Sequence, residues 1–310
     1  MAILLTILAG AIGALSNLFV RKSMDEGRTA RGFLVFQMAG AFLFSIFLGP
    51  LRSGDYTFNL SIACFGLISG TILACMLFFL GKALEQGPPG FTFSILNAGN
   101  VMPAIVMWVL FSSTGNFNYT VWHGLGSLFV LGGLFWAGKG LTGMQDQGKW
   151  VLFSAAMFFL QVALLSLFQW RAFLLNISHI EEVVSFFTSE QVQSQWFLPF
   201  MFLGAAFLQA IIYLLTEKRR FHSKEISQGL LGGVVNSLGV FFLICSTEMA
   251  SPLQNAMIFP ISSVTTIVLS NFWGQKLYAE DVNWKACQFC VLGLILGTVD
   301  WKGIASALGF

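Results

Sequence analysis

Charged residues are scarce in this chain, and their scarcity excludes most classes of protein. Of its 310 residues, 10% are charged and 56% are hydrophobic, whereas an average soluble domain is about 25% charged. The 16 Lys and Arg nearly balance the 14 Asp and Glu, so no basic excess points to nucleic acid as a partner. The composition instead predicts a polytopic membrane protein whose main neighbour is the lipid bilayer.

Catalytic and metal-binding motifs are also missing. No Gly-x-Ser-x-Gly, His-Glu-x-x-His or Walker-type glycine loop occurs. The three histidines, His123, His179 and His222, lie at the ends of apolar runs or between them, and the five cysteines lie within such runs. Cysteines in that setting are typical of reduced core thiols. We therefore expect no enzyme, no cofactor and no metal site.

Ten apolar runs are long enough for helices that cross a bilayer, which takes about 20 residues. They cover residues 2–20, 32–50, 60–81, 91–111, 121–138, 150–170, 196–216, 227–247, 252–274 and 282–299. Because Arg21 and Lys22 follow the first run, we interpret it as a retained helix and not as a signal peptide. Between the sixth and seventh runs, residues 178–187 combine a capping-box pattern with one apolar face, which predicts a short interfacial helix.

The basic residues are distributed unevenly between the loops. Thirteen of the 16 Lys and Arg follow odd-numbered runs and three follow even-numbered ones. Since basic loops stay in the cytoplasm, this bias predicts outward-facing termini. We expect a multi-pass protein of a bacterial cytoplasmic (inner) membrane.

An internal repeat relates the two halves of the chain. An offset of 163 residues aligns the third to fifth runs with the eighth to tenth, so that Glu85 meets Glu248. An offset of 150 aligns the first two runs with the sixth and seventh more weakly, and Arg21 then meets Arg171. Five spans per copy is an odd number, so the second copy must be inverted relative to the first.

The predicted fold is therefore an all-α membrane protein of ten transmembrane helices, arranged as a 5+5 inverted-topology repeat. Residues 1–140 form the first repeat and residues 141–310 the second, within one membrane unit. Two similar halves can open one central site alternately to either side, so alternating access is the expected mechanism. Three pairs of glycines have the small-xxx-small spacing of packed helices: Gly66 and Gly70, Gly229 and Gly233, Gly293 and Gly297. Whether they pack within the chain or in a homo-oligomer is left open.

Two segments carry a resemblance to a known family. The first run ends Gly13-Ala-Leu-Ser-Asn-Leu-Phe-Val-Arg-Lys22, and Ala83-Leu84 is followed twenty residues on by Pro103. With ten spans in two halves, the chain resembles the drug/metabolite transporter superfamily in its EamA-like branch. It departs from that pattern in the second half, where Thr266 stands opposite Pro103. The resemblance implies a secondary transporter of amino acids, sugars, nucleotide precursors or drugs.

The polar residues inside the runs are neutral. Amides and hydroxyls gather on single helix faces, and we expect these to line a central cavity: Asn17, Gln37, Asn97, Asn100, Gln161, Gln209, Asn236, Asn255, Ser262 and Thr266, with Trp108 in an aromatic wall. Amides both donate and accept hydrogen bonds, which suits a neutral or zwitterionic cargo such as an amino acid, a sugar or a nucleoside. The alternative is that they join helices to one another.

Charged residues at the ends of the runs are candidates for coupling or gating. These are Glu85, Glu248, Arg21 and Arg171. A carboxylate there could bind a coupling proton or latch a gate by pairing with a base, and the alternative is an acid in water at the interface. We expect a secondary transporter of a small organic metabolite, with a proton as a possible coupling ion. A lipid-linked substrate flippase or an intramembrane enzyme using the same cavity is the alternative.

Overall fold

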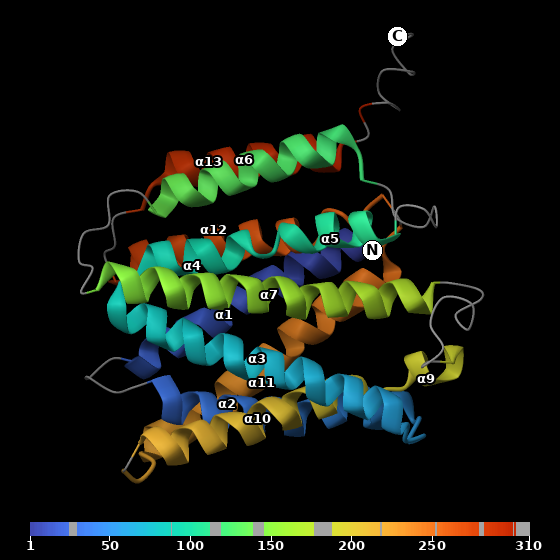
Figure 1. The fold of residues 1–310 in the computed structure, drawn as a ribbon, viewed down its shortest axis with the longest axis vertical. Coiled ribbons are helices and arrows are strands. Elements are labelled where there is room, and N and C mark those ends of the chain that lie inside the picture. Colours follow the sequence, from blue (N-terminus) through green and yellow to red (C-terminus); the bar gives the residue numbers. More distant parts are fainter. Residues whose placement is uncertain are drawn as a thin grey trace.

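The computed structural model describes residues 1–24, 30–87, 89–111, 119–138, 146–176, 188–217, 219–251, 253–278, 282–299 and 301, and within these ranges it contains helices and no strands. The helices are α1 (Ala2–Met24), α2 (Ala30–Ile46), continued by the π-helix η2 (Phe47–Leu51), α3 (Leu60–Gln86), α4 (Pro89–Ala98), α5 (Met102–Phe111), α6 (Val121–Gly138), α7 (Gln147–Leu175), α9 (Ser189–Gln193), α10 (Phe197–Thr216), α11 (Ser223–Met249), α12 (Ile258–Tyr278) and α13 (Trp284–Thr298) (Figure 1).

The helices have the length and surface of a membrane protein. Among the described residues, seven stretches are long and apolar enough to cross a bilayer: α1, α2 with η2, α3, α4 with α5, α7, α10 and α11. Helices α6, α12 and α13 cover the remaining predicted runs. Large apolar side chains project outward, including Phe159 and Phe207, both 68% exposed, and Leu215, 78% exposed. Such a surface requires lipid around it, so the predicted α-helical integral membrane protein is confirmed.

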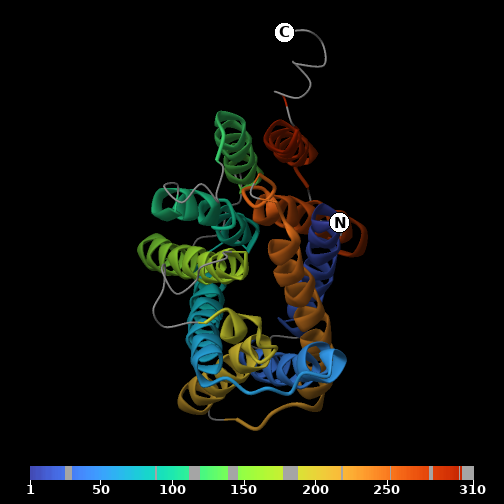
Figure 2. The same ribbon diagram turned by 90° about the vertical axis from the view of Figure 1, so that its right-hand side faces the viewer.

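Viewed end-on, the helices form two rows, and a pair of helices lies at each extreme of these rows. Helices α6 and α13 contact each other at one extreme of the bundle, and α2 and α10 do so at the other (Figure 2). Helix α3 packs on α7 and α10 along one row, whereas α11 packs on α1 and α2 along the other. Helix α1 also packs on α12, and α7 packs on α4 and α5.

The fourth predicted run is not one helix, which corrects the sequence interpretation. The chain leaves the helical path at Gly99, Asn100 and Val101, where the backbone N–H groups of Asn100 and Val101 donate to the carbonyls three residues back. Pro103 explains the restart, because proline lacks the N–H of an interior helix position but fits the first turn. Asn100 therefore lies in a turn and not on the helix face of Asn97.

The ninth predicted run also begins later than expected. Residues 253–257 form turns, and α12 starts only at Ile258, with Pro260 in its first turn. Asn255 consequently lies in the turns and not on the helix that carries Ser262 and Thr266. The predicted interfacial helix at residues 178–187 lies outside the described residues; the described part of that connection contains the short helix α9.

The cysteines are free, and two of them are core residues as expected. Cys287 and Cys290 are buried, whereas Cys64 is exposed. Leu60 and Ile68, one turn to either side of Cys64 on α3, are also exposed, so this face of α3 is directed outward and the expectation of a core thiol is wrong there.

Glycines bring the backbones of α3 and α10 into direct contact. A Cβ on Gly66 would lie 2.6 Å from the carbonyl oxygen of Phe197, and one on Gly70 would overlap the carbonyl of Met201. Only glycine allows this approach, which is typical of small-xxx-small packing in membranes.

The same contact recurs 163 residues later between α11 and α2. A Cβ on Gly229 would lie 2.9 Å from the carbonyl oxygen of Phe33, and one on Gly233 would overlap the carbonyl of Gln37. The third pair packs on α6, where a Cβ on Gly293 would lie 2.7 Å from the carbonyl oxygen of Gly126. The glycine pairs therefore act within the chain.

These contacts predict which glycines tolerate a methyl group. We expect Gly70→Ala and Gly233→Ala each to lower the free energy of unfolding by about 1–3 kcal/mol, because overpacking forces the helices apart. Gly81→Ala on α3 is the matched control, since a Cβ on Gly81 would have nothing within 4 Å of it; alanine there should be neutral or stabilise by up to about 1 kcal/mol. Thermal unfolding in detergent measures all three, and equal stability of Gly70→Ala and Gly81→Ala contradicts the interpretation.

Candidate functional site

The break between α4 and α5 gathers polar side chains from three helices. Asn97, the penultimate residue of α4, donates from Nδ2 to the carbonyl oxygen of Phe93 at 2.8 Å. The hydroxyl of Ser263 on α12 donates to Asn97 Oδ1 at 3.1 Å and lies 3.2 Å from the Asn97 carbonyl oxygen. Ser263 thus ties α12 to the end of α4.

Asn100 in the turn is held by α7. Gln161 on α7 donates from Nε2 to Asn100 Oδ1 at 2.7 Å, and the Gln161 side chain packs so close to Gly99 that a Cβ there would lie 3.2 Å from Gln161 Cγ. We call Asn97, Asn100, Gln161 and Ser263 the amide cluster. It joins α4, α7 and α12 where the helix is broken.

The amide cluster has hydrogen-bonding capacity left over. Asn100 Nδ2 donates to no described residue, and Gln161 Oε1 accepts from none. Both side chains are half-buried, so a donor and an acceptor lie next to each other within reach of a small molecule. Such a pair matches a neutral polar group better than an isolated charge.

Three other predicted cavity residues join helices instead. Gln37 on α2 donates to the hydroxyl of Ser16 on α1 at 3.2 Å. Gln209 on α10 is 2% exposed and donates to the carbonyl oxygen of Ala74 on α3 at 3.0 Å. Thr266 on α12 has its hydroxyl 3.0 Å from the carbonyl oxygen of Gly10 on α1. These bonds satisfy the polar groups within the bundle.

The remaining predicted cavity residues are dispersed. The side chains of Asn17 on α1 and Asn236 on α11 are half-buried and bond to no described residue. Asn255 accepts with its carbonyl oxygen from Gln169 at 2.9 Å, while its Oδ1 is buried without a partner among the described residues.

Ser262 and Trp108 make no hydrogen bond to the amide cluster. The carbonyl oxygen of Ser262 accepts from the hydroxyl of Thr266 within α12. Trp108 on α5 is 43% exposed, with its ring centroid 6.0 Å from that of Tyr119. The aromatic wall expected at Trp108 is thus partly open to the surroundings.

Ion pairs join the helices at one end of the bundle. Arg31 at the start of α2 bonds Glu85 at the end of α3, at 3.1 Å, and Glu217 just after α10, at 3.5 Å. Lys82 also pairs with Glu85, at 2.8 Å. Arg219 pairs with Glu217 and, at 2.6 Å, with Glu225 at the start of α11. These residues form the first ion cluster, which connects α2, α3, α10 and α11.

One carboxylate of the first ion cluster is deeply buried. Glu225 is 1% exposed and accepts from both Nη atoms of Arg219. These hydrogen bonds raise the pKa of the Arg219 guanidinium above its ordinary value, against the opposing effect of desolvation. Arg21, another predicted gating residue, lies at the end of α1 and also interacts with a neighbouring group.

A second, smaller ion cluster lies at the opposite end, where α7 and α11 terminate. Arg171 on α7 forms a short ion pair from Nη1 to Glu248 Oε1. Its Nη2 donates to the carbonyl oxygen of Val192 on α9 at 3.1 Å, and its guanidinium lies 5.0 Å from the ring centroid of Phe197 on α10. Arg171 is 7% exposed. Its contacts join α7 to α9, α10 and α11. Glu85 and Glu248 thus lie at opposite ends, as the inverted repeat predicts.

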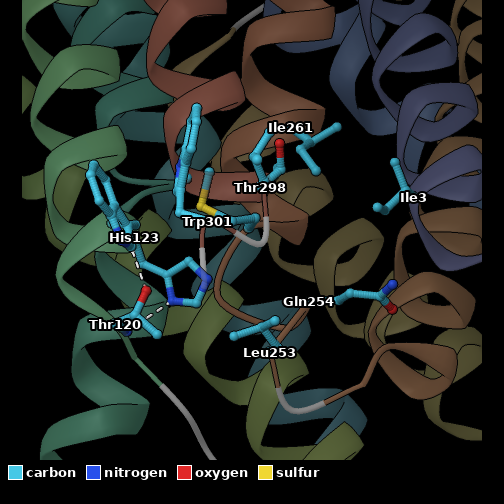
Figure 3. Close-up of a pocket in the computed structure, with 12 residues that line it drawn as sticks. Ile3, Thr120, His123, Leu253, Gln254, Ile261, Thr298 and Trp301 are labelled. Carbon is cyan, nitrogen blue, oxygen red and sulfur yellow. Dashed lines mark hydrogen bonds between the residues drawn. The ribbon is translucent and has the colours of Figure 1, made fainter. Parts of the chain in front are cut away.

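A separate pocket lies between α1, the start of α6 and the turns before α12 (Figure 3). It is lined by Ile3 of α1, by Thr120 and His123 at the start of α6, by Gln254 and by Trp301. His123 accepts at Nδ1 from the N–H of Thr120 at 3.0 Å, while the Thr120 hydroxyl accepts from the N–H of His123. His123 therefore caps a helix, as does His222 at the start of α11; His179 lies outside the described residues.

Sequence reasoning missed Ser263, Arg31, Glu217 and Arg52. Ser263 could have been found, because the offset of 163 that aligns the repeats places it opposite Asn100. Arg31 and Glu217 had no such signal, since their pairing depends on where the ends of α2 and α10 meet. Within the described part of the chain, no group of three or more His, Cys, Asp or Glu could hold a metal ion.

Comparisons with known proteins support the fold alone. No family model and no curated protein matches the sequence. A solved structure described as "Crystal structure of protein" is similar, with a TM-score of 0.69 and 15% sequence identity over 96% of this chain and 98% of that chain. At this identity the likeness concerns the arrangement of helices along nearly the whole chain.

Proposed function

We propose that the chain is a secondary carrier for a small neutral or zwitterionic organic metabolite, of the drug/metabolite transporter type. The observation that carries this proposal is the amide cluster at the break between α4 and α5. In carriers, substrate sites form where transmembrane helices are discontinuous, because irregular backbone is tolerated only where protein or a cavity satisfies it. Asn100 Nδ2 and Gln161 Oε1 supply the free donor and acceptor for the cargo.

The helix contacts support a 5+5 inverted repeat over residues 1–140 and 141–310. Helix α3 packs on α10 and α7, and its counterpart α11 packs on α2 and α1. The glycine contacts are likewise related: Gly70 meets Met201, and Gly233 meets Gln37. The pairs α2/α10 and α6/α13 each join a helix to its own counterpart, as a pseudo-two-fold axis through those pairs requires.

The two ion clusters fit gates on either side of the amide cluster. Glu225 and Glu248 begin and end the same helix, and 23 residues of α helix span roughly 35 Å. Breaking one cluster while keeping the other opens a central site to one side only, which is alternating access. The first ion cluster holds more pairs than the second, so the end with Arg171 and Glu248 opens more readily.

The amide cluster predicts which amides matter for transport. We expect Gln161→Ala and Asn100→Ala each to reduce uptake into proteoliposomes roughly tenfold, because each loses about one hydrogen bond to cargo or its partner. Uptake of labelled amino acids, sugars and nucleosides is measured per folded protein.

Gln209→Ala is the control for these variants. Gln209 joins α10 to α3 away from the amide cluster, so its loss should lower the unfolding temperature and leave uptake per folded protein near wild type. Unchanged uptake in both Gln161→Ala and Asn100→Ala would contradict the assignment of the amide cluster as the substrate site.

The second ion cluster predicts the accessibility of Cys245. This half-buried thiol lines the pocket beside Glu248 and Arg171. With the other four cysteines replaced by serine, Glu248→Gln and Arg171→Gln should each speed labelling by a membrane-impermeant maleimide several-fold, because each breaks the pair and opens the gate.

The two variants control for each other. A purely electrostatic effect on the reactivity of Cys245 has opposite signs in the two variants, because one removes a negative neighbour and the other a positive one. Faster labelling in both variants supports a gate, whereas faster labelling in Glu248→Gln alone contradicts it.

A further inference from the structure

A pocket at the second ion cluster contains more positive than negative charge. Its lining includes Arg52 after η2, Arg171 on α7 and Glu248 on α11. Since Glu248 pairs with Arg171, one guanidinium charge in the pocket is left without a counter-charge. This charge belongs to Arg52, which is exposed, so an anion that enters the pocket can reach it and pair with it.

The irregular backbone of η2 positions Arg52. In an α-helix the N–H of Arg52 would donate to the carbonyl of Leu48; here it donates to the carbonyls of Phe47 and Gly49. Pro50 lies inside this segment and lacks an N–H. The carbonyl of Leu48 is thereby freed, and it accepts from Arg52 Nε at 2.8 Å. A π-helical turn of this kind frequently marks a functional site.

The held guanidinium keeps its outer donors available. Arg52 lies 5.2 Å from the ring centroid of Phe241 on α11, and its two Nη atoms bond to no described residue. Arg171 contributes positive charge to the pocket, since its Nη1 and Nη2 already bond Glu248 and the Val192 carbonyl and its Nε is buried. The unused N–H groups at this pocket are therefore those of Arg52.

The remaining walls of the pocket are largely apolar. Phe197 and Leu198 come from α10, and Phe241 and Ile244 from α11. A ligand that satisfies this pocket has an anionic group for the arginines and an apolar body for these side chains. A planar carboxylate matches the guanidinium donors in geometry as well as in charge.

We infer that this pocket is the access site of the carrier and that it selects cargo bearing a carboxylate, with Arg52 as its anion-binding residue and the charge of Arg171 beside it. This inference rests on the proposed function. It selects the amino acid among the three cargo classes that the amide cluster admits, because sugars and nucleosides carry no carboxylate. Glu248 pairs with Arg171 through Oε1, and its Oε2, which bonds to no described residue, can accept from the ammonium group of a zwitterion.

The test measures ligand binding to the purified full chain by the rise in its unfolding temperature in detergent. Probes are the twenty common amino acids, L-leucinamide, L-leucinol, glucose and uridine. We expect stabilisation by apolar amino acids such as L-leucine, since bound ligand stabilises by mass action, and none by the amide or the alcohol, which lack the carboxylate. Equal stabilisation by L-leucine and L-leucinamide overturns the inference.

Arg52→Gln tests the residue assignment. It should weaken the apparent affinity for L-leucine roughly tenfold or more, because a charged hydrogen-bond donor is lost. Arg220→Gln is the matched control, since Arg220 is exposed at the other end of the bundle and its side chain bonds to no described residue. Unaltered affinity in Arg52→Gln, measured on protein that elutes as a single folded species, counts against the assignment.

The outcomes separate this inference from the proposed function. Binding and proteoliposome uptake of glucose or uridine, with no response to any amino acid, overturn the carboxylate inference and leave the carrier intact. No binding and no uptake with any probe overturn both.

Discussion

Every backbone polar group inside a bilayer must find its partner within the protein, and the rest of this structure depends on that constraint. It explains why the regular structure of the described residues consists of helices. It also makes the interruption between α4 and α5 informative. At Gly99 to Val101 the N–H groups bond to carbonyls three or four residues back, and the Asn97 carbonyl receives Ser263. The interruption is thus supported by neighbouring helices, and the side chains that support it form the candidate site.

The positions of the helices follow from composition, whereas their irregularities do not. Runs of about 20 apolar residues located the spans because hydrocarbon thickness sets helix length. The break at Asn100 and the π-helix before Arg52 depend on how Pro103 and Pro50 are accommodated, and a proline can kink, break or restart a helix according to its neighbours. The late start of α12 has the same origin. Sequence spacing alone therefore placed Asn255 and Asn100 on helix faces that they do not share.

The amides show how far side-chain pattern predicts a site. Asn97, Asn100 and Gln161 belong to the predicted set and meet in the structure. Gln37 and Gln209 belong to the same set and join helices. In sequence the two groups look alike, because an amide stabilises a helix contact and a polar ligand through the same hydrogen bonds. Only the partner atoms distinguish them: a carbonyl or hydroxyl of a packed helix in one case, and spare donors and acceptors in the other.

In the proposed carrier, charge placement links the fold to the choice of cargo. The middle of the bundle carries neutral amides, so its hydrogen bonds discriminate weakly between cargo classes of similar polarity. Arg52 at one end supplies what the amides lack, because its guanidinium pairs with a carboxylate and not with a neutral hydroxyl or amide of similar size. Selection at this access site followed by neutral binding at the centre keeps the central affinity moderate.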